Sequence, residues 1–145
     1  MKKMITSCIA SLLAVMTVNA QNWVNTSPQN KKVVLEEFTG IKCTFCPDGH
    51  KRANELKAAN KGNVFLVNIH SGGYATPAAG EPDLRTTEGD AIDDASGLTG
   101  YPAGSINRFK SPRAESRANW SASANTVLAQ SSPVNTYVKS FFDRK

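Results

Sequence analysis

The sequence predicts an α/β domain, on the basis of three observations. Short β-branched apolar runs at residues 32–38 and 64–69 are typical of buried strands. Between them, small and apolar positions recur every three or four residues from Cys46 to Leu56, which is typical of a helix. A strand, a helix and a second strand in this order fit a βαβ unit, whose strands are parallel and whose crossover is right-handed.

The N-terminus is typical of a secretory signal peptide at residues 1–20. Lys2-Lys3 precedes an apolar run from Met4 to Val18, and Val18-Asn19-Ala20 supplies the small residues that a signal peptidase recognises. The apolar run falls short of the roughly 20 residues that a membrane-spanning helix needs. We therefore expect an exported protein whose mature chain starts at Gln21.

Charge and size narrow the functional class. The chain has 17 basic and 12 acidic residues. Without Lys2 and Lys3, 15 basic residues remain against 12 acidic ones, a net charge of +3, and the two signs are interspersed. This balance predicts a solvated mixed surface and no nucleic-acid partner. A chain of this size buries about two-thirds of its unfolded surface, so it does not need disulfides in order to fold.

The other elements follow from periodicity and turn residues. Gly62 is expected to end the first helix. The remaining elements are an extended leader at 21–31, a loop rich in Gly, Ala and Pro at 71–82, a second helix over 84–95, a third strand at 104–109, a last helix at 120–128, and a final strand at 134–142.

Cys43 and Cys46 carry the candidate chemistry. They are the two cysteines of the mature chain, because Cys8 belongs to the signal peptide. A C-x-x-C pair closes too short a loop to be an efficient staple, which favours a chemical role. The pair follows the first strand, and a helix N-terminus stabilises a thiolate, as does the neighbouring Lys42. Cys46, one turn into the helix, is expected to resolve a mixed disulfide.

Two other roles for the cysteines stay open. His50 follows Cys46 by one turn and His70 ends the second strand, so Cys43, Cys46, His50 and His70 could form a Cys2His2 zinc site. The spacing C-x2-C-x3-H-x19-H matches no common zinc ribbon or finger. A buried and inert cysteine pair is the other alternative. The sequence indicates no cofactor.

A C-x-x-C motif at the start of the helix of a βαβ unit, with a later proline before a strand, resembles the thioredoxin fold. The resemblance implies a central mixed sheet flanked by helices. It implies that Glu37, six residues before Cys43, is a buried acid that accepts the proton of Cys46. It also implies that Pro102 is a cis-proline, and that the Tyr101–Pro102 peptide pairs with an extended substrate.

Three stretches narrow this resemblance to one family. They look like the exported thioredoxin-like part of the 28-kilodalton outer-membrane protein family of Gram-negative bacteria. The match covers residues 33–135 and rests on residues 35–40, 43–50 and 99–104, with Asn107-Arg108. It implies a periplasmic or outer-membrane-associated location. Lys42 and Phe45 differ from the residues of thioredoxin itself, and we expect them to contact substrate together with Tyr101.

The same resemblance predicts the domain organisation. A thioredoxin-like domain covers residues 32–131, and residues 132–145 are the start of a β-rich second domain that is cut short. The strand at 134–142 would then be an unpaired edge, which favours self-association. Residues 110–116 show no clear signal for a fourth core strand. The loop at 72–77 follows the second strand and should lie at the same sheet edge as the cysteines, as a partner contact or a plain connection.

Two functions therefore stand side by side. The first is thiol-disulfide exchange with protein thiols and disulfides as partners. The second is an outer-membrane-associated binding or surface module that keeps a structural disulfide on the same scaffold. Fold resemblance alone does not decide between them, so the sequence leaves open whether the protein is an enzyme.

Overall fold

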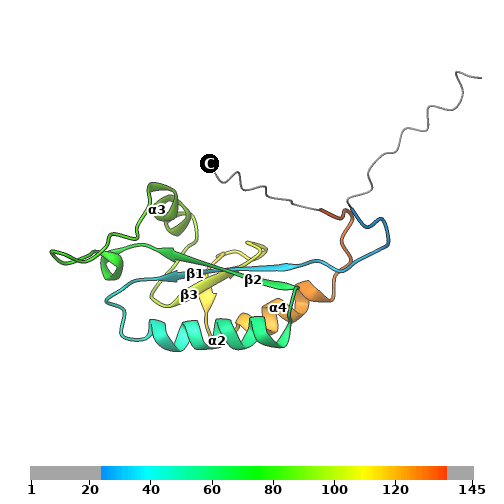
Figure 1. Ribbon diagram of the computed structural model, residues 1–145, viewed down its shortest axis with the longest axis horizontal. Helices are drawn as coiled ribbons and strands as arrows, with labels where there is room; N and C mark the ends of the chain where they lie inside the picture. Colours follow the sequence, from blue (N-terminus) through cyan, green and yellow to red (C-terminus); the bar gives the residue numbers. More distant parts are fainter. Residues whose placement is uncertain (1–23, 137–145) are drawn as a thin grey trace, which may run out of the picture. The chain divides into compact units, whose positions relative to one another are not determined.

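The structure, a computed structural model, describes residues 24–136. This part of the chain forms a four-stranded mixed sheet with three α-helices, so the predicted α/β class is confirmed (Figure 1). The elements are β1 (Val33–Thr39), α2 (Cys46–Ala59), β2 (Val64–His70), the short 3-10 helix η2 (Gly73–Ala75), α3 (Thr87–Asp94), β3 (Ala103–Ile106), β4 (Glu115–Ser116) and α4 (Trp120–Leu128).

The strands lie in the order β2-β1-β3-β4. β1 and β2 are parallel neighbours over their whole length, from the pair Val33 and Val64 to the pair Thr39 and His70. Since α2 connects them, the βαβ unit predicted from the sequence is confirmed. β3 runs antiparallel to β1, and β4 runs antiparallel to β3. β1 is therefore a central strand, and its carboxyl end lies beside that of β2.

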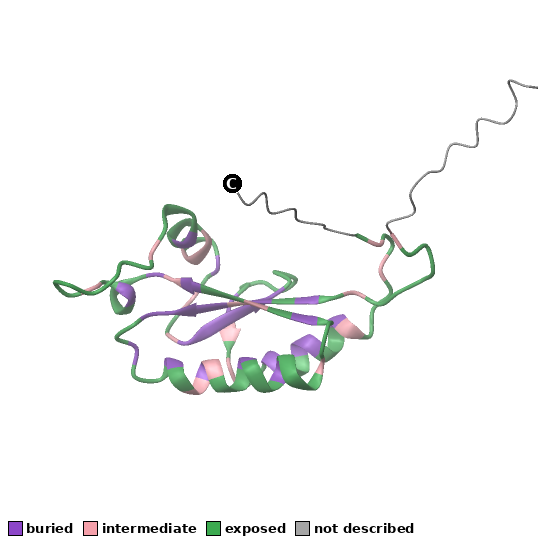
Figure 2. Ribbon diagram, in the orientation of Figure 1, coloured by how far each residue is buried: buried purple, intermediate pink, exposed green. Residues whose placement is uncertain are grey.

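Side chains alternate along β1 and divide the core between the two faces of the sheet. Val33 and Leu35 pack with α2 and α4 on one face, in a cluster that includes Trp120. Phe38 packs on the other face with Ile69, against partly buried side chains of α3 and the loop that follows it. Figure 2 shows the buried residues along the strands and on the sheet-facing sides of α2 and α4. Burial on both faces holds the carboxyl end of β1 firmly.

The helices α2 and α4 agree with their predicted spans. The buried positions of α2 are Cys46, Gly49, Ala53 and Leu56, which is the predicted apolar face. In α4, Trp120 is buried, and its indole Nε1–H donates to the carbonyl oxygen of Glu115 at 3.2 Å. This bond ties α4 to β4.

The third strand is shorter than predicted and a fourth strand follows it. β3 ends at Ile106, because Asn107 and Arg108 adopt positive φ values of 49° and 51° and turn the chain. The side chain of Asn107 then continues the hydrogen bonding of the sheet. Its Oδ1 accepts from the backbone N–H of Val34 at 2.6 Å, and its Nδ2 donates to the carbonyl of Lys32 at 2.8 Å. The two-residue strand β4 was missed because its segment is polar.

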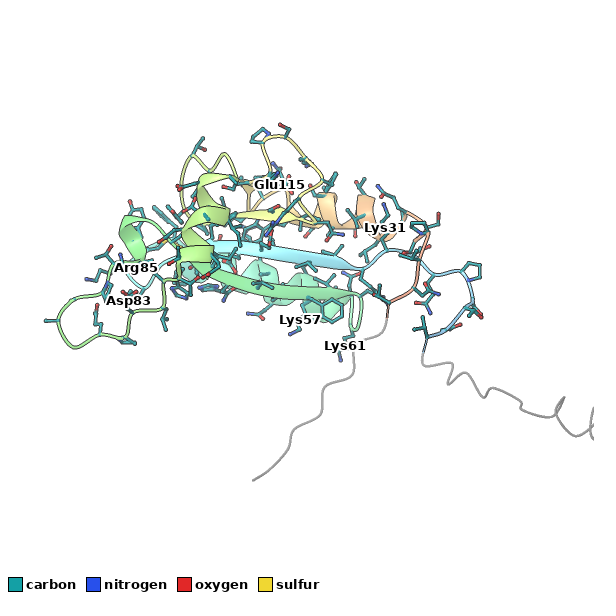
Figure 3. All side chains as sticks on the ribbon, turned by 90° about the horizontal axis from the view of Figure 1, so that it is seen from above. Lys31, Lys57, Lys61, Asp83, Arg85 and Glu115 are labelled. Atoms are coloured by element: carbon teal, nitrogen blue, oxygen red, sulfur yellow. A yellow bond between two sulfur atoms is a disulfide. The ribbon has the colours of Figure 1, made fainter. Side chains whose placement is uncertain are left out.

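The second helix starts three residues later than predicted. Leu84 lies outside α3 and is 48% exposed. Asp83 accepts hydrogen bonds from both the backbone N–H and the guanidinium of Arg85, which holds this part of the chain in a turn (Figure 3). Thr86 then caps the helix, since its Oγ1 accepts from the N–H of Gly89 at 2.9 Å.

The described chain divides into two compact units, of which residues 28–133 form the larger. Within it, the backbone at 29–31 pairs with the backbone at 130–132. In the other unit, the side-chain amide of Asn135 donates to the carbonyls of Asn25 and Ser27.

Several predictions concern residues outside this description. The signal peptide and most of the strand at 134–142 fall outside residues 24–136, and the described positions 134–136 carry no strand. Among the described residues, no helix combines the length and the apolar character needed to cross a bilayer.

Candidate redox site

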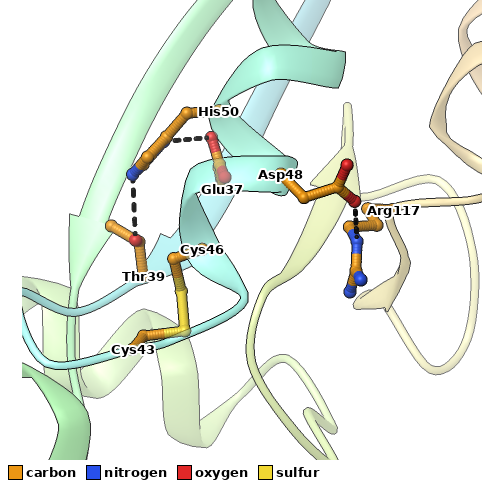
Figure 4. The surroundings of a disulfide bond; sticks show 7 residues. All are labelled: Glu37, Thr39, Cys43, Cys46, Asp48, His50 and Arg117. Atoms are coloured by element: carbon orange, nitrogen blue, oxygen red, sulfur yellow. Dashed lines mark hydrogen bonds and ion pairs between the residues drawn. A yellow bond between two sulfur atoms is a disulfide. The ribbon is translucent and has the colours of Figure 1, made fainter.

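Cys43 and Cys46 form a disulfide at the turn between β1 and α2 (Figure 4). Their Cα atoms are 5.4 Å apart, and the N–H of Cys46 donates to the carbonyl of Cys43 at 3.2 Å. Cys46 is the first residue of α2, so the expectation that it lies one turn into the helix is wrong. Pro47 follows it, and a proline is well placed there because the first helical N–H groups have no acceptor within the helix.

The two cysteines differ in accessibility. Cys43 is 8% exposed and Cys46 is 1% exposed. Phe45, which lies between the two cysteines in the sequence and directly precedes α2, is exposed to solvent. Of the two cysteines, Cys43 is therefore the more accessible from solvent.

Glu37 is buried in the middle of the sheet, as the resemblance predicted. It lies on β1 between Asn68 of β2 and Gly104 of β3, and it is 1% exposed. Its Oε2 is 3.1 Å from Nδ1 of His50, whereas its Oε1 is buried without a hydrogen-bond partner. Burial raises the pKa of Glu37, and the charge and hydrogen bond of His50 offset part of that rise.

Gly49 brings α2 close to Glu37 and Pro102. A Cβ atom at Gly49 would lie 2.5 Å from Oε1 of Glu37 and 2.9 Å from the Cβ of Pro102. Cys46 stands three residues earlier on the same buried face of α2. Oε1 of Glu37 therefore lies against the first turn of α2, which begins at Cys46.

His50 contacts β1 at two places. Its Nε2 is 3.3 Å from Oγ1 of the buried Thr39, and its Nδ1 contacts Glu37. The zinc alternative needs His50 with His70, Cys43 and Cys46. Within residues 24–136, however, no group of three or more His, Cys, Asp or Glu side chains is arranged to hold a metal ion. The structure thus gives the zinc alternative no support.

A groove of about 350 Å³ runs between α2 and β2 beside this pair. It is lined by Glu37, His50, Ala53, Asn54, Lys57, Leu66 and Asn68. The lining is mostly polar and includes the buried carboxyl of Glu37. Water in this groove can therefore come close to the Glu37 carboxyl, which the sheet otherwise encloses.

The Tyr101–Pro102 peptide bond is cis, as the resemblance predicted. Tyr101 is held by a hydrogen bond from its hydroxyl to Oδ2 of Asp93 at 2.5 Å. Burial, together with this bond to a carboxylate, raises the pKa of Tyr101 to about 12. The ring also makes an edge contact with Tyr74, with centroids 5.8 Å apart. α3 and the loop after β2 thus fix the residue before Pro102.

The loop at 72–77 lies at the same edge as the cysteines, as expected. The N–H of Lys42 donates to the carbonyl of Tyr74 at 3.0 Å, which joins the loop to the turn before Cys43. The ammonium of Lys42 lies 3.5 Å from the carboxylate of Glu81. An exposed pair of this kind stabilises little, so Lys42 remains available to a partner.

Cys43, Cys46 and Glu37 were predicted as candidate site residues, but the contacts that hold these residues in place were not. Gly49 is the main omission, although a glycine on the buried face of a helix is a recognisable sign of close packing. Thr39 and Asp93 carry no such local sign, because their contacts come from distant segments.

Comparison with family models, with curated proteins and with solved structures finds no match for this chain.

Proposed function

We propose that this protein is an exported thiol-disulfide exchange protein built on a thioredoxin-like scaffold. The observation that carries the proposal is the buried carboxyl of Glu37, whose Oε1 has no hydrogen-bond partner and lies beneath the turn opened by Cys46. Burying an ionisable group is unfavourable for folding, so such a group is a candidate for catalysis. A disulfide that served only as a staple would need no acid beside it.

The length of the disulfide loop also favours chemistry. The two cysteines are three positions apart, and by the chain-entropy relation so short a loop stabilises a fold by only about 2 kcal/mol. The fold already has a core on both faces of its sheet. The pair is therefore more useful as a reactive group than as a constraint.

The proposed reduction of a partner proceeds in two steps. The thiolate of Cys43 attacks a partner disulfide, forms a mixed disulfide and releases one partner thiolate. Cys46 then gives its proton to Oε1 of Glu37, and its thiolate attacks the sulfur of Cys43. The mixed disulfide breaks, the second partner thiolate leaves, and the Cys43–Cys46 disulfide forms. Two electrons pass to the partner, and oxidation of a partner dithiol is the reverse sequence.

The proposal includes the partner and the location expected from the sequence. Partners are protein thiols and disulfides, and Phe45, Lys42 and the Tyr101–Pro102 peptide are the residues proposed to contact them. The family proposed is the 28-kilodalton outer-membrane protein family, which implies a periplasmic or outer-membrane-associated protein. The sheet order and the flanking helices are compatible with that scaffold.

One observation favours the second candidate, a binding module with a structural disulfide. Val34 and Phe65 are direct neighbours across β1 and β2, and both are exposed, as is Val67 two positions along. These side chains form an apolar patch on the sheet face that α3 covers only in part. Exposed patches of this type are common at protein contacts.

The reduction potential of the Cys43–Cys46 pair distinguishes the two candidates. We expect a value between about −120 and −270 mV, the range of exchange proteins, in a glutathione series read by alkylation and mass. In addition, Cys46→Ser should accumulate mixed disulfides with a reduced-and-reoxidised substrate protein, whereas Cys43→Ser should not. A potential below about −300 mV together with no trapped species would support the binding module instead.

A further inference from the structure

His50 contacts both the buried carboxyl of Glu37 and the hydroxyl of Thr39 (Figure 4). Its Nδ1 is 3.1 Å from Oε2 of Glu37, and its side chain is 37% exposed while that of Glu37 is 1% exposed. Both residues line the groove of about 350 Å³ between α2 and β2. A proton held by Glu37 therefore has a short path to water through the imidazole.

The exchange reaction needs such a path. Cys46 can give its proton only to an ionised Glu37, so the carboxyl must lose any proton that it holds before each resolution step, in the first turnover as in later ones. Burial favours the neutral carboxyl, and Glu37 is 1% exposed, so its proton needs a neighbouring acceptor on the way to water. The two carboxyl oxygens meet neighbouring residues of α2: Oε1 lies against Gly49, and Oε2 faces His50.

We propose that His50 is a positioning and proton-transfer residue, which carries the proton that Glu37 takes from Cys46 to water in the groove. This inference rests on the proposed function. The proton equilibrates between the carboxyl oxygens and passes from Oε2 to Nδ1. The half-exposed imidazolium then turns its Nδ1–H away from Glu37 and releases that proton to water, which leaves the carboxylate of Glu37 and a neutral ring with its proton on Nε2. In the reverse reaction the same groups supply a proton to the thiolate of Cys46.

Thr39 orients the imidazole for this role. Its Oγ1 lies 3.3 Å from Nε2, so when it accepts the Nε2–H, the lone pair of Nδ1 faces Glu37. In that arrangement one proton is shared between Oε2 of Glu37 and Nδ1 of His50. A neutral carboxyl would donate to Nδ1, and an ionised one would accept from it.

The effect of His50 on Glu37 must be distinguished from the effects of other ionisable groups nearby. Lys57 of α2 lines the same groove, and the other polar residues of the lining, Asn54 and Asn68, are uncharged. His70 lies at the end of β2, where burial and the charge of His50 lower its pKa. His70→Gln is thus the matched control, because it makes the same substitution at the same sheet edge and leaves the contact between Glu37 and His50 in place.

The first test follows the reaction of the reduced protein with dithiobis(nitrobenzoic acid) in a single turnover. Each of the two steps releases one nitrothiobenzoate ion, which absorbs visible light. The fast phase reports the attack of Cys43 and the slow phase reports resolution by Cys46. We expect His50→Gln to slow the second phase about tenfold at pH 7, a modest part of what proton transfer contributes to catalysis. The first phase should be unchanged, added imidazole should restore part of the second, and His70→Gln should behave like the parent.

The second test needs no activity. The titration of the Glu37 side-chain carboxyl, followed by carbon NMR, should shift to higher pH in His50→Gln, because the charge and hydrogen bond of His50 lower the pKa of Glu37. His70→Gln should leave this titration in place.

Each contrary outcome has a separate meaning. An unchanged second phase in His50→Gln, with Cys46→Ser still trapping partners, would overturn the proton path and leave the exchange function intact. A slow second phase without rescue by imidazole and with an unchanged Glu37 titration would show a merely structural role, which also overturns it. Absence of a second phase in the parent, together with absence of trapped partners in Cys46→Ser, would remove the exchange function and the proton path together.

Discussion

At Gly49 the backbone of α2 comes so close to Glu37 and Pro102 that a methyl group has no room. The ring of Pro102 is rigid, and the carboxyl of Glu37 is already held by His50. An added Cβ must therefore push the helix away from the sheet or displace the acid. Either movement changes the position of Cys46 relative to Glu37, its proposed proton acceptor.

Gly49→Ala should lower the free energy of unfolding by about 1 to 3 kcal/mol, the usual effect of overpacking. The clash outweighs the roughly 1 kcal/mol that alanine gains over glycine inside a helix. Urea unfolding at pH 7 measures this change. Gly100→Ala is the matched control, since a Cβ there meets nothing within 4 Å. Equal stability of the two variants would contradict the packing described for α2.

At the residue scale, sequence and resemblance predicted the cysteine pair and the buried acid but not their contacts. The spacing of Cys43 and Cys46 and their place after a strand were sufficient to predict a reactive pair. The resemblance supplied the buried Glu37 and the cis bond before Pro102. The roles of His50 and Gly49 depend on how α2 lies against β1, which is a tertiary property that local patterns do not contain.

At the scale of elements, α3 depends on its cap more than the other helices do. It has only eight residues, and a helix this short is marginal without tertiary contacts and caps. Its single buried residue is Gly89, and the N–H of Gly89 is the donor that Thr86 satisfies. Since α3 also carries Asp93, its stability affects the position of Tyr101.

Thr86→Ala should therefore destabilise the protein by about 1 kcal/mol, the usual effect of losing an N-cap. Hydrogen exchange should show faster opening of α3, while α2 and α4 keep their protection. Thr87→Ala, an exposed change one residue later, is the control. If both variants exchange alike, the cap at Thr86 contributes nothing.

The elements that could be predicted are those whose own pattern decides their structure. α2 and α4 each show an apolar face with helical spacing, and both were placed within a few residues. β3 was overextended, because Asn107 and Arg108 turn the chain although neither is a glycine or a proline. β4 has two polar residues, and its place is set by pairing with β3 and by the bond to Trp120.

At the scale of the whole molecule, the buried carboxyl makes folding depend on pH. A raised pKa of Glu37 means that the native state binds its proton more tightly than the unfolded chain. The associated stability is fully present below the ordinary value of 4.5 and is lost as the pH rises through the native pKa. The oxidised protein should therefore be less stable in alkaline than in mildly acidic solution on account of this residue.

Glu37→Gln should remove this dependence. We expect the variant to gain stability relative to the parent as the pH rises above 4.5, and the difference to be smallest in acid. Thermal or urea unfolding across the pH range measures it for both proteins in the oxidised form. A difference that stays constant with pH would mean that Glu37 titrates alike in the native and unfolded states.

The side chain of Asn107 also makes the start of β1 sensitive to deamidation. Its carboxamide stands in for a peptide group, because the oxygen accepts from Val34 and the nitrogen donates to the carbonyl of Lys32. Slow hydrolysis of that amide during storage would put a carboxylate oxygen opposite a carbonyl oxygen, where a donor had been. A molecule hydrolysed at Asn107 would then show a mass increase at this residue and a loosened start of β1, a chemical change that freshly made protein would lack.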